Sequence, residues 1–214
     1  TRQICNELLD EFSDSGSCDA SADYAQHIPV KVIARMIGIP EEDGDLFRKW
    51  VHELLEIGPT NRNVGQQAAR EVFDYFGEYL KARRADPRDD IVTYFIETEV
   101  DGQPMDDSQI LGGLFLLLLA GIDTTWSSIG SSFWHLGQHP KDRQRLASDS
   151  TSFDPAVEEF LRFYSPVTMA RVITDEVEIS GTTLCPGQRV LLPFAAANRD
   201  TDFMEDADTF QIDR

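Results

Sequence analysis

The sequence has few basic residues for its acidity. Its 19 lysines and arginines stand against 38 aspartates and glutamates, so the 214 residues carry a formal net charge of −19. Nucleic acids and anionic membrane surfaces attract proteins through a basic face, so neither is an expected partner. Cysteine is also scarce. Cys5, Cys18 and Cys185 are odd in number, widely spaced and in no CxxC pair, which favours reduced thiols in the cytoplasm over a disulfide framework or a zinc site.

Several motifs of catalysis and targeting are absent. There is no Gly-x-Gly-x-x-Gly for a dinucleotide, and the segment 126–130 lacks the Gly-x-Ser-x-Gly of a hydrolase nucleophile. The histidines have no metal-site spacing, and His135 is expected to pack or to face solvent near a helix end. No signal peptide, repeat or low-complexity tract occurs, and no apolar run reaches the roughly 18 residues of a membrane span.

Hydrophobic periodicity predicts a mainly α-helical chain that forms a single domain over residues 1–214. Apolar residues recur at helical spacing, between Gly, Pro and Ser breaks, in the segments 3–12, 29–37, 46–57, 64–84, 91–98, 106–137 and from 154 onward, and 140–147 is expected to be a polar helix. After residue 166 the pattern changes to short strands at 168–174, 177–179 and 190–194, with turns at 180–181 and 186–187.

The longest predicted helix begins near Asp106, which can form a capping box with Gln109. From residue 110 to 122 no side chain is charged and apolar residues occur on all sides of the helix, which predicts a central, buried helix. The polar group Asp123, Thr124 and Thr125 follows directly, and unpaired polar groups are costly in a buried helix. Two interpretations stay open on these residues: a core helix beside a wet crevice, or a groove that holds a small molecule next to a hydroxyl and an acid.

The next long amphipathic helix carries Glu159 and Arg162, which are three residues apart and can pair. Its predicted inward stripe is Val157, Phe160, Leu161 and Tyr164, which leaves this pair on the opposite face. On spacing alone the pair is an exposed one that contributes about 0.3–0.5 kcal/mol, and Glu158 is an equally good partner for Arg162.

The order of these motifs resembles a known family. Ala120-Gly121-Ile122-Asp123-Thr124-Thr125 is similar to the oxygen-activation motif in the long central helix of the bacterial cytochrome P-450 heme-thiolate monooxygenases. Glu159-x-x-Arg162 on a following helix, then Pro166, short strands, Asn198-Arg199-Asp200 and the segment 208–214 follow in the order that this family has. The resemblance implies a cytochrome P-450-like helical fold with a long central buried helix and a small β region after residue 166.

The resemblance also implies roles for individual residues. Asp123 and Thr124 would be catalytic, with Thr124 bonding to bound oxygen and Asp123 supplying protons. Ala120 and Gly121 would make room for oxygen and heme, and Arg171 would pair with a heme propionate. Leu116, Val167 and Met169 would line the substrate pocket. Glu159 and Arg162 would be structural, and Arg214 would complete their network. An exposed strand arginine and ordinary core residues are the alternatives for Arg171 and for the pocket positions.

The sequence differs from the family's pattern in lacking the cysteine that binds the iron. The iron-ligating cysteine belongs to a Phe-x-x-Gly-x-x-x-Cys-x-Gly loop that no cysteine here matches, and Cys185 lies in Leu-Cys-Pro-Gly. We therefore expect a partial domain, truncated at both ends, that has no metal ligand and by itself binds heme poorly and does not turn over. The complete protein is expected to be a cytoplasmic monooxygenase that uses heme, O2, an apolar small molecule and a ferredoxin- or flavin-type electron donor. The alternative is a non-enzymatic helical module that binds an apolar ligand.

Overall fold

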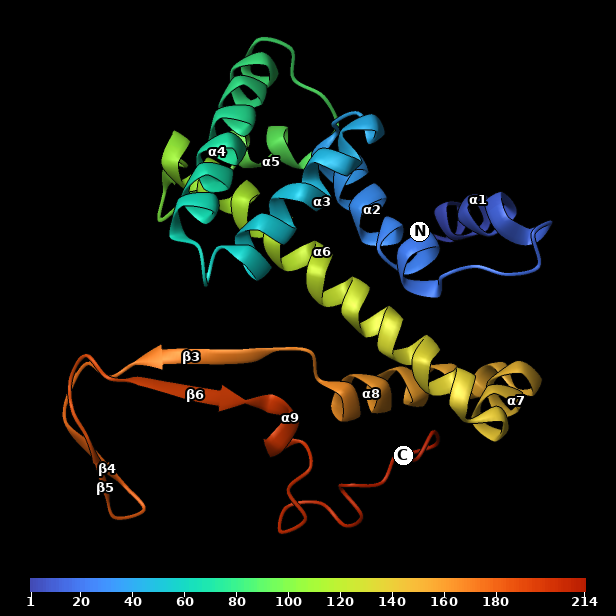
Figure 1. Cartoon of the computed structure of the whole chain (residues 1–214). Coiled ribbons are helices and arrows are strands. Elements are labelled where there is room, and N and C mark those ends of the chain that lie inside the picture. Colours follow the sequence, from blue (N-terminus) through green and yellow to red (C-terminus); the bar gives the residue numbers. More distant parts are fainter. The chain divides into compact units, whose positions relative to one another are not determined.

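The computed structural model describes residues 1–214, which form mostly helices and three two-stranded antiparallel sheets (Figure 1). The chain groups into two compact units, Thr1–Ser127 and Ser128–Arg214, and helix α6 belongs to both. The mainly helical class with a long central helix and a small β region is confirmed. The expectation of one domain stays a prediction.

The first unit is built from helices and one small hairpin. It contains α1 (Arg2–Ser13), a π-helical turn (Ala20–Ala25), α2 (His27–Ile37), a 3-10 turn (Glu41–Asp43), α3 (Gly44–His52), a second π-helical turn (Glu53–Ile57), α4 (Arg62–Ala85), α5 (Ile91–Glu97), the hairpin of β1 (Glu99–Val100) and β2 (Gln103–Pro104), and the larger part of α6 (Asp107–Gln138).

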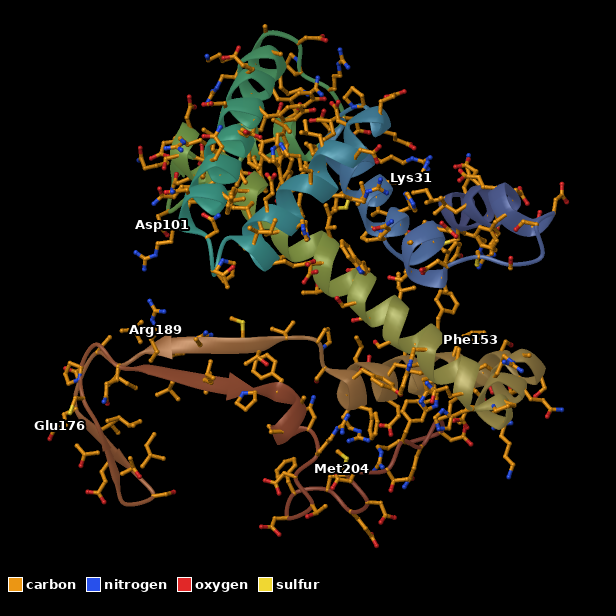
Figure 2. All side chains as sticks on the ribbon, viewed as in Figure 1. Lys31, Asp101, Phe153, Glu176, Arg189 and Met204 are labelled. Carbon is orange, nitrogen blue, oxygen red and sulfur yellow. The ribbon has the colours of Figure 1, made fainter.

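The second unit combines helices with two hairpin-like ladders. After the end of α6 come α7 (Pro140–Ser148), a 3-10 turn (Ser150–Ser152), α8 (Phe153–Tyr164), β3 (Thr168–Val172), β4 (Val177–Ile179), β5 (Thr182–Leu184), β6 (Arg189–Pro193) and α9 (Phe194–Ala197). Strand β3 pairs with β6, and β4 pairs with β5. Charged side chains such as Asp101, Glu176 and Arg189 are exposed and extend away from the ribbon (Figure 2).

The predicted capping box begins α6. The backbone N–H of Gln109 donates to the Asp106 carboxylate over 2.8 Å, and the Asp106 N–H donates to the Gln109 side chain over 2.9 Å. Each side chain thus satisfies a backbone donor that the first helical turn leaves without a partner. The sequence signal for this helix start is confirmed.

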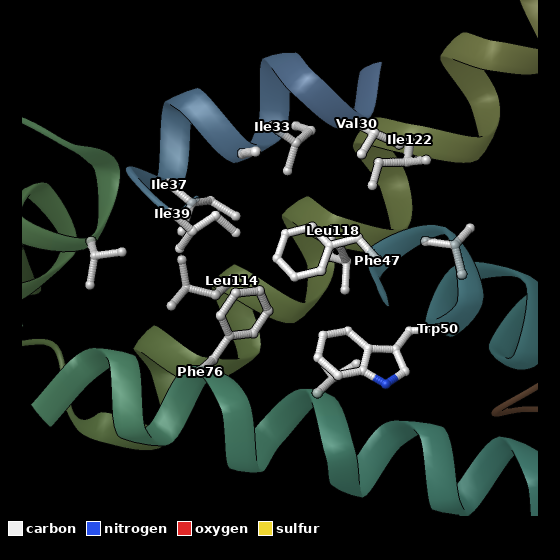
Figure 3. Packing of buried hydrophobic residues seen from close by; sticks show 14 of the residues in the cluster. Val30, Ile33, Ile37, Ile39, Phe47, Trp50, Phe76, Leu114, Leu118 and Ile122 are labelled. Atoms are coloured by element: carbon white, nitrogen blue, oxygen red, sulfur yellow. The ribbon is translucent and has the colours of Figure 1, made fainter. Parts of the chain in front are cut away.

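One face of α6 forms the centre of the first unit's core. Ile110, Leu114, Leu118 and Ile122 are fully buried at a spacing of four residues, which places them on one stripe. They pack against apolar side chains of α2, α3 and α4, as Figure 3 shows: Ile33, Ile37, Phe47, Trp50 and Phe76.

The prediction that α6 is buried on all sides is wrong for this chain. Leu116 is 65% exposed, and Gly112 and Ala120, four residues to either side of it, are exposed too. These positions lie about 200° around the helix from the buried stripe, at 100° per residue. Only one face of α6 is therefore covered by the core, although the whole helix is apolar.

The expectation about membrane spans also needs correction. By length and composition alone, α6 could cross a bilayer. The uncharged run ends at Asp123, but the helix continues to Gln138 and its long apolar window includes few charges. The core helix of a protein outside membranes passes the same test, and the buried stripe of α6 makes the contacts of a core helix.

The start and the inward face of α8 differ from the prediction. The helix begins at Phe153 after Ser152, one residue before the predicted start. Val157 and Leu161, predicted to point inward, are 51% and 45% exposed, whereas Glu159 is 2% exposed. The helix is thus rotated so that its buried face carries a carboxylate, which is tolerable only where partners compensate the charge.

The short strands of the second unit are connected by tight turns. Ser180 and Gly181, between β4 and β5, have φ values of 50° and 76°, as a two-residue type I′ hairpin turn requires. The predicted turns at 180–181 and 186–187 are confirmed. Strand β5 was not predicted.

Candidate functional site

The polar group on α6 follows directly after the buried stripe. The Thr124 hydroxyl donates to the carbonyl oxygen of Ala120, one turn earlier, over 2.7 Å. This bond competes with the helical hydrogen bonds at that carbonyl and fixes the side chain on the helix surface. The contact brings Thr124 and Ala120 together.

Asp123 has an environment unlike that of a surface aspartate. Its side chain is half-buried, and burial raises its pKa, with a further contribution from the carboxylate of Glu56 on the π-helical turn Glu53–Ile57. Both causes disfavour the charged form, so this carboxyl keeps its proton to a higher pH than usual. A group tuned in this way is suited to holding and releasing a proton. Sequence reasoning did not find Glu56, which lies 67 positions before Asp123.

Gly121 faces the core of its own unit. A Cβ placed there would lie 2.6 Å from Cδ1 and 3.2 Å from Cγ1 of Ile33 on α2, closer than van der Waals contact allows. The missing side chain therefore lets α2 and α6 approach each other. This packing explains the glycine without a ligand, and its role beside oxygen stays a prediction.

Leu116 and Ala120 lie on the uncovered face of α6. With Gly112 they form a stripe of exposed apolar positions opposite the core. Glycine and alanine are small, so the surface has low relief on both sides of Leu116. The chemistry of this stripe suits a flat or bulky apolar group.

Val167, Met169 and Arg171 lie in or next to β3 in the second unit. They are two residues apart and so share one face of the strand. Val167 is half-buried, and Met169 and Arg171 are exposed. The Arg171 guanidinium donates to the neighbouring carbonyl of Ala170 over 2.9 Å. That these residues and those of α6 border one pocket stays a prediction.

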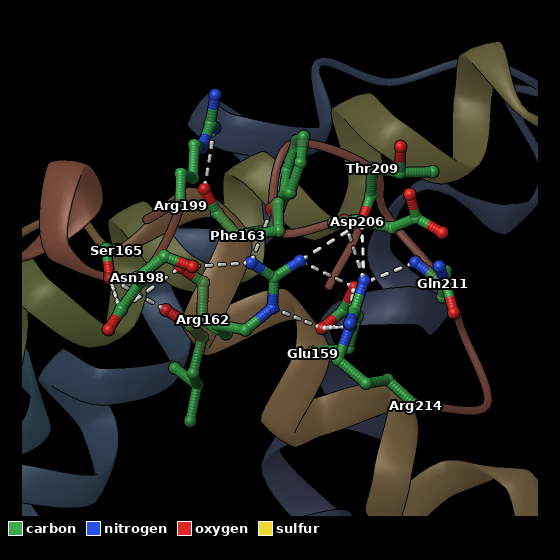
Figure 4. A network of polar contacts seen from close by, with 12 residues as sticks. Glu159, Arg162, Phe163, Ser165, Asn198, Arg199, Asp206, Thr209, Gln211 and Arg214 are labelled. Carbon is green, nitrogen blue, oxygen red and sulfur yellow. Dashed lines mark hydrogen bonds and ion pairs between the residues drawn. The ribbon is translucent and has the colours of Figure 1, made fainter. Parts of the chain in front are cut away.

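Glu159 and Arg162 form the centre of a buried network (Figure 4). Arg162 donates to both carboxylate oxygens of Glu159, over 2.6 and 2.8 Å. The carboxylate also accepts the backbone N–H of Gln211 over 2.8 Å and Nε of Arg214 over 3.2 Å. The interpretation as an exposed pair is wrong, and Arg162 bonds to Glu159 rather than to the exposed Glu158. The predicted participation of Arg214 is present.

The two arginines of this network fix the C-terminal segment through its backbone. Arg162 donates to the carbonyl oxygens of Asn198, Ala207 and Thr209 over 2.7, 2.7 and 3.2 Å. Arg214 donates to carbonyls of residues 205, 206 and 209 over 3.0–3.1 Å. The accepting groups are main-chain oxygens, so no residue type in the sequence could have revealed them.

Burial and hydrogen bonding act in opposite directions on Glu159. Burial alone would raise its pKa, but the hydrogen bonds from Arg162, the Gln211 N–H and Arg214 outweigh it, and the pKa is lowered. The carboxylate is therefore charged and fully partnered. Such a group stabilises an architecture and is unsuited to proton transfer near neutral pH.

No part of the structure gathers a metal-binding cluster of three His, Cys, Asp or Glu side chains. The three cysteines are free thiols, with Cys5 half-buried and Cys18 and Cys185 exposed. His135, expected to pack or to face solvent, is buried.

Comparisons with known proteins agree with this description. A sequence model of the family described as Cytochrome P450 matches residues 47–214. The polyketide biosynthesis cytochrome P450 PksS of Bacillus subtilis (strain 168) is 32% identical over 214 residues, which are 99% of this chain and 53% of that protein. The 6-deoxyerythronolide B hydroxylase of Saccharopolyspora erythraea is 35% identical over 214 residues, again 99% and 53% of the two chains.

Solved structures give the same result. The structure of PksS has a TM-score of 0.92 at 33% identity and covers 99% of this chain and 55% of its own. The ligand-free structure of cytochrome P450 TbtJ1 has a TM-score of 0.89 at 34% identity, with 100% and 58% covered. The chain thus spans about half the length of the relatives that it matches.

Proposed function

Because this chain belongs to the cytochrome P450 family, we propose that the complete protein is a heme-dependent monooxygenase that inserts one O2-derived oxygen atom into a largely apolar small molecule. The observation that carries the proposal concerns two consecutive residues of α6. The Thr124 hydroxyl is held by a hydrogen bond to a helix carbonyl, and the carboxyl group of Asp123 has a raised pKa. An oxygen-splitting reaction consumes protons, and these two side chains can hold one and pass it on.

The residues present fit a heme on the chemistry of their side chains. The stripe of Gly112, Leu116 and Ala120 is apolar and exposed, which suits contact with the face of a porphyrin. Arg171 presents an exposed cation that suits a carboxylate. Heme held by a cysteine thiolate supplies the binding and reductive cleavage of O2. The proposal places that thiolate outside these 214 residues, since no cysteine here has the required loop.

Each predicted site residue then has one task. Asp123 holds and releases a proton at its carboxyl group, and Thr124 supplies a hydroxyl from the next position of α6. Leu116 supplies an apolar side chain for the substrate, and Val167 and Met169 supply two more. Glu159 and Arg162 do no chemistry and hold the C-terminal segment in place.

We place the enzyme in the cytoplasm, with a ferredoxin- or flavin-type protein as electron donor, by analogy with the family. The 214 residues alone are expected not to turn over, because they lack the thiolate. A reduced-CO absorption band of thiolate-ligated heme from this polypeptide alone would contradict that expectation.

The test uses the full-length holoenzyme with a generic ferredoxin and ferredoxin reductase, and a steroid and a long-chain fatty acid as apolar probes. Asp123→Asn is expected to lower oxygenated product by about 100-fold, the low end of what a positioned proton donor contributes. Thr124→Ala is expected to divert electrons from product to hydrogen peroxide. Thr125→Ala, at the exposed neighbouring hydroxyl, is the matched control and should keep the wild-type ratio.

Two outcomes would reject the proposal. If the reduced holoprotein with CO gives no band of thiolate-ligated heme, the protein is not such an enzyme, and binding of the apolar probes without heme would then favour the non-catalytic module. If Thr124→Ala and Thr125→Ala release equal amounts of peroxide, the assignment of the α6 hydroxyl is wrong.

A further inference from the structure

Three polar side chains of the second unit form a chain of hydrogen bonds to which the proposed function assigns no role. Nε2 of His135 is 2.8 Å from the Asp142 carboxylate, and Nδ1 is 2.7 Å from the hydroxyl of Tyr164. His135 is 2% exposed. The three side chains come from three separate elements, α6, α7 and α8.

The direction of both hydrogen bonds follows from their chemistry. An ionised carboxylate only accepts hydrogen bonds, so the Nε2 atom of His135 must carry the proton that faces Asp142. In the neutral imidazole Nδ1 then has a lone pair, and the Tyr164 hydroxyl must donate to it. The phenol is therefore aligned with a base that is oriented by an acid.

The surroundings of Tyr164 are aromatic. Its ring has Phe160, Phe163 and Phe210 as neighbours, with centroids 6.3, 5.3 and 6.4 Å away. Trp134 meets it edge to face at 6.1 Å, and this indole is 59% exposed. The phenol thus lies between a buried base and an aromatic ring at the surface. Burial also raises its pKa, which Arg199 lowers in part and Asp142 raises further, so the phenol does not lose its proton unaided near neutral pH.

We propose that Tyr164 is a redox-active tyrosine, with His135 as its proton acceptor and Trp134 as its connection to the protein surface. A phenol is oxidised far more readily when its proton leaves together with the electron. The aligned Nδ1 of His135 can take that proton without any rearrangement, and the Asp142 carboxylate balances the positive charge that results.

Tyr164 gives one electron to a one-electron oxidant, its O–H bond breaks, and an N–H bond forms at Nδ1 of His135. The product is a neutral tyrosyl radical beside an imidazolium–carboxylate pair. A small-molecule reductant such as ascorbate returns an electron through Trp134, and the proton moves back to the phenol oxygen.

This inference rests on the proposed function only for its biological use. An oxygen-splitting heme enzyme without substrate holds oxidising equivalents that can damage it, and a tyrosine of this kind would release them to solution. The redox chemistry itself needs only an external oxidant, so it can be tested separately from monooxygenase activity.

The experiment is flash-quench oxidation of the full-length protein with a photogenerated ruthenium(III) polypyridyl complex, followed by electron paramagnetic resonance. Ring-deuterated tyrosine identifies the radical. Tyr164→Phe is expected to remove the fast tyrosyl signal. Tyr94→Phe, at an exposed tyrosine, is the matched control and should leave it intact. His135→Gln keeps a hydrogen-bonding side chain but offers a much weaker base, and should slow radical formation about 100-fold.

The outcomes are distinct. A signal that is unchanged in Tyr164→Phe, or a rate that is unchanged in His135→Gln, would overturn the proposal. Where His135→Gln fails to fold, a wild-type chain in D2O replaces it, and a rate without an isotope effect would be equally fatal. Failure of the monooxygenase assay with an intact tyrosyl signal would reject the proposed function alone.

Discussion

Arg162→Ala should strongly destabilise the second unit. The variant removes the two hydrogen bonds at 2.6 and 2.8 Å to Glu159 and leaves a carboxylate that is 2% exposed with only Gln211 and Arg214 as partners. Removal of one member of a buried ion pair costs about 3–5 kcal/mol, because the other charge stays buried. That is a large part of the 5–15 kcal/mol by which a typical domain is stable.

Three carbonyl oxygens also lose a hydrogen bond from Arg162, but their free-energy costs do not add in full. Taken singly, each hydrogen bond to a charged donor is worth about 1.5–3 kcal/mol. Asn198 is half-buried and Thr209 is exposed, so water can replace part of what their carbonyls lose, whereas Ala207 is buried. We therefore expect the total to stay near the upper end of 3–5 kcal/mol. Arg162→Lys should be intermediate, because an ammonium cannot donate as a planar fork.

The assay is urea denaturation together with hydrogen exchange of the segment 205–214, whose Gln211 N–H donates to Glu159. Exchange of this N–H should accelerate in Arg162→Ala. Glu158→Gln is the matched control, since this exposed neighbour should change the free energy of unfolding by no more than about 0.5 kcal/mol. If Arg162→Ala costs no more than Glu158→Gln, the network does not stabilise the fold and the reasoning fails.

The same network predicts a pH dependence. The pKa of Glu159 is lower in the folded protein, so between the two pKa values the unfolded state binds more protons. The contribution of Glu159 is complete above the unfolded pKa and is lost as the pH falls through the folded one. In Glu159→Gln, the free energy of unfolding should therefore fall less steeply as the pH is lowered than in the wild type. An identical slope in the two proteins would contradict the assignment.

Three further predictions concern the first unit. Gly121→Ala should lower the free energy of unfolding by about 1 kcal/mol, because overpacking costs about 1–3 kcal/mol and the better helix propensity of alanine returns about 1 kcal/mol. In the Ile33→Val background the Cδ1 atom that would lie 2.6 Å from the new Cβ is absent, and urea denaturation should show little or no cost. Asp123→Asn should stabilise the protein at neutral pH but not below the ordinary pKa of aspartate, because a raised folded pKa makes the native state less stable as pH rises; a gain equal at all pH values would count against this. Arg83→Met should cost about 3–5 kcal/mol in urea denaturation, because it leaves the Asp90 carboxylate, 2.7 Å from Nε of Arg83, buried without its cation; a cost below 1 kcal/mol would show that the pair is dispensable.

The features that could be predicted best from the sequence are those with a local cause. The capping box of Asp106 and Gln109 involves residues three positions apart, and the turn at Ser180-Gly181 depends on its own two residues. Each could be predicted because the physical cause lies within a few residues. The contact of Thr124 with the carbonyl of Ala120 belongs to the same class.

Features that depend on distant partners could not be predicted from periodicity. Glu159 is buried because Arg214 and the N–H of Gln211, 55 and 52 positions away, meet it. The glycine at 121 is explained by Ile33 on another helix. Family resemblance found the Glu159–Arg162 pair where spacing alone favoured a surface ion pair, since the order of motifs carries information that the hydrophobic pattern of one helix lacks.

The separation along the chain between Arg162 and its carbonyl acceptors has a kinetic consequence. Helix α8 consists of local contacts, whereas the bonds from Arg162 to Ala207 and Thr209 close loops of 45 and 47 residues. Loop closure of this kind slows folding. During synthesis, α8 would leave the ribosome with its carboxylate and guanidinium paired only to each other, and the segment that completes their hydrogen bonds would follow later. Acquisition of protease resistance by residues 198–214 should therefore be the late step in refolding.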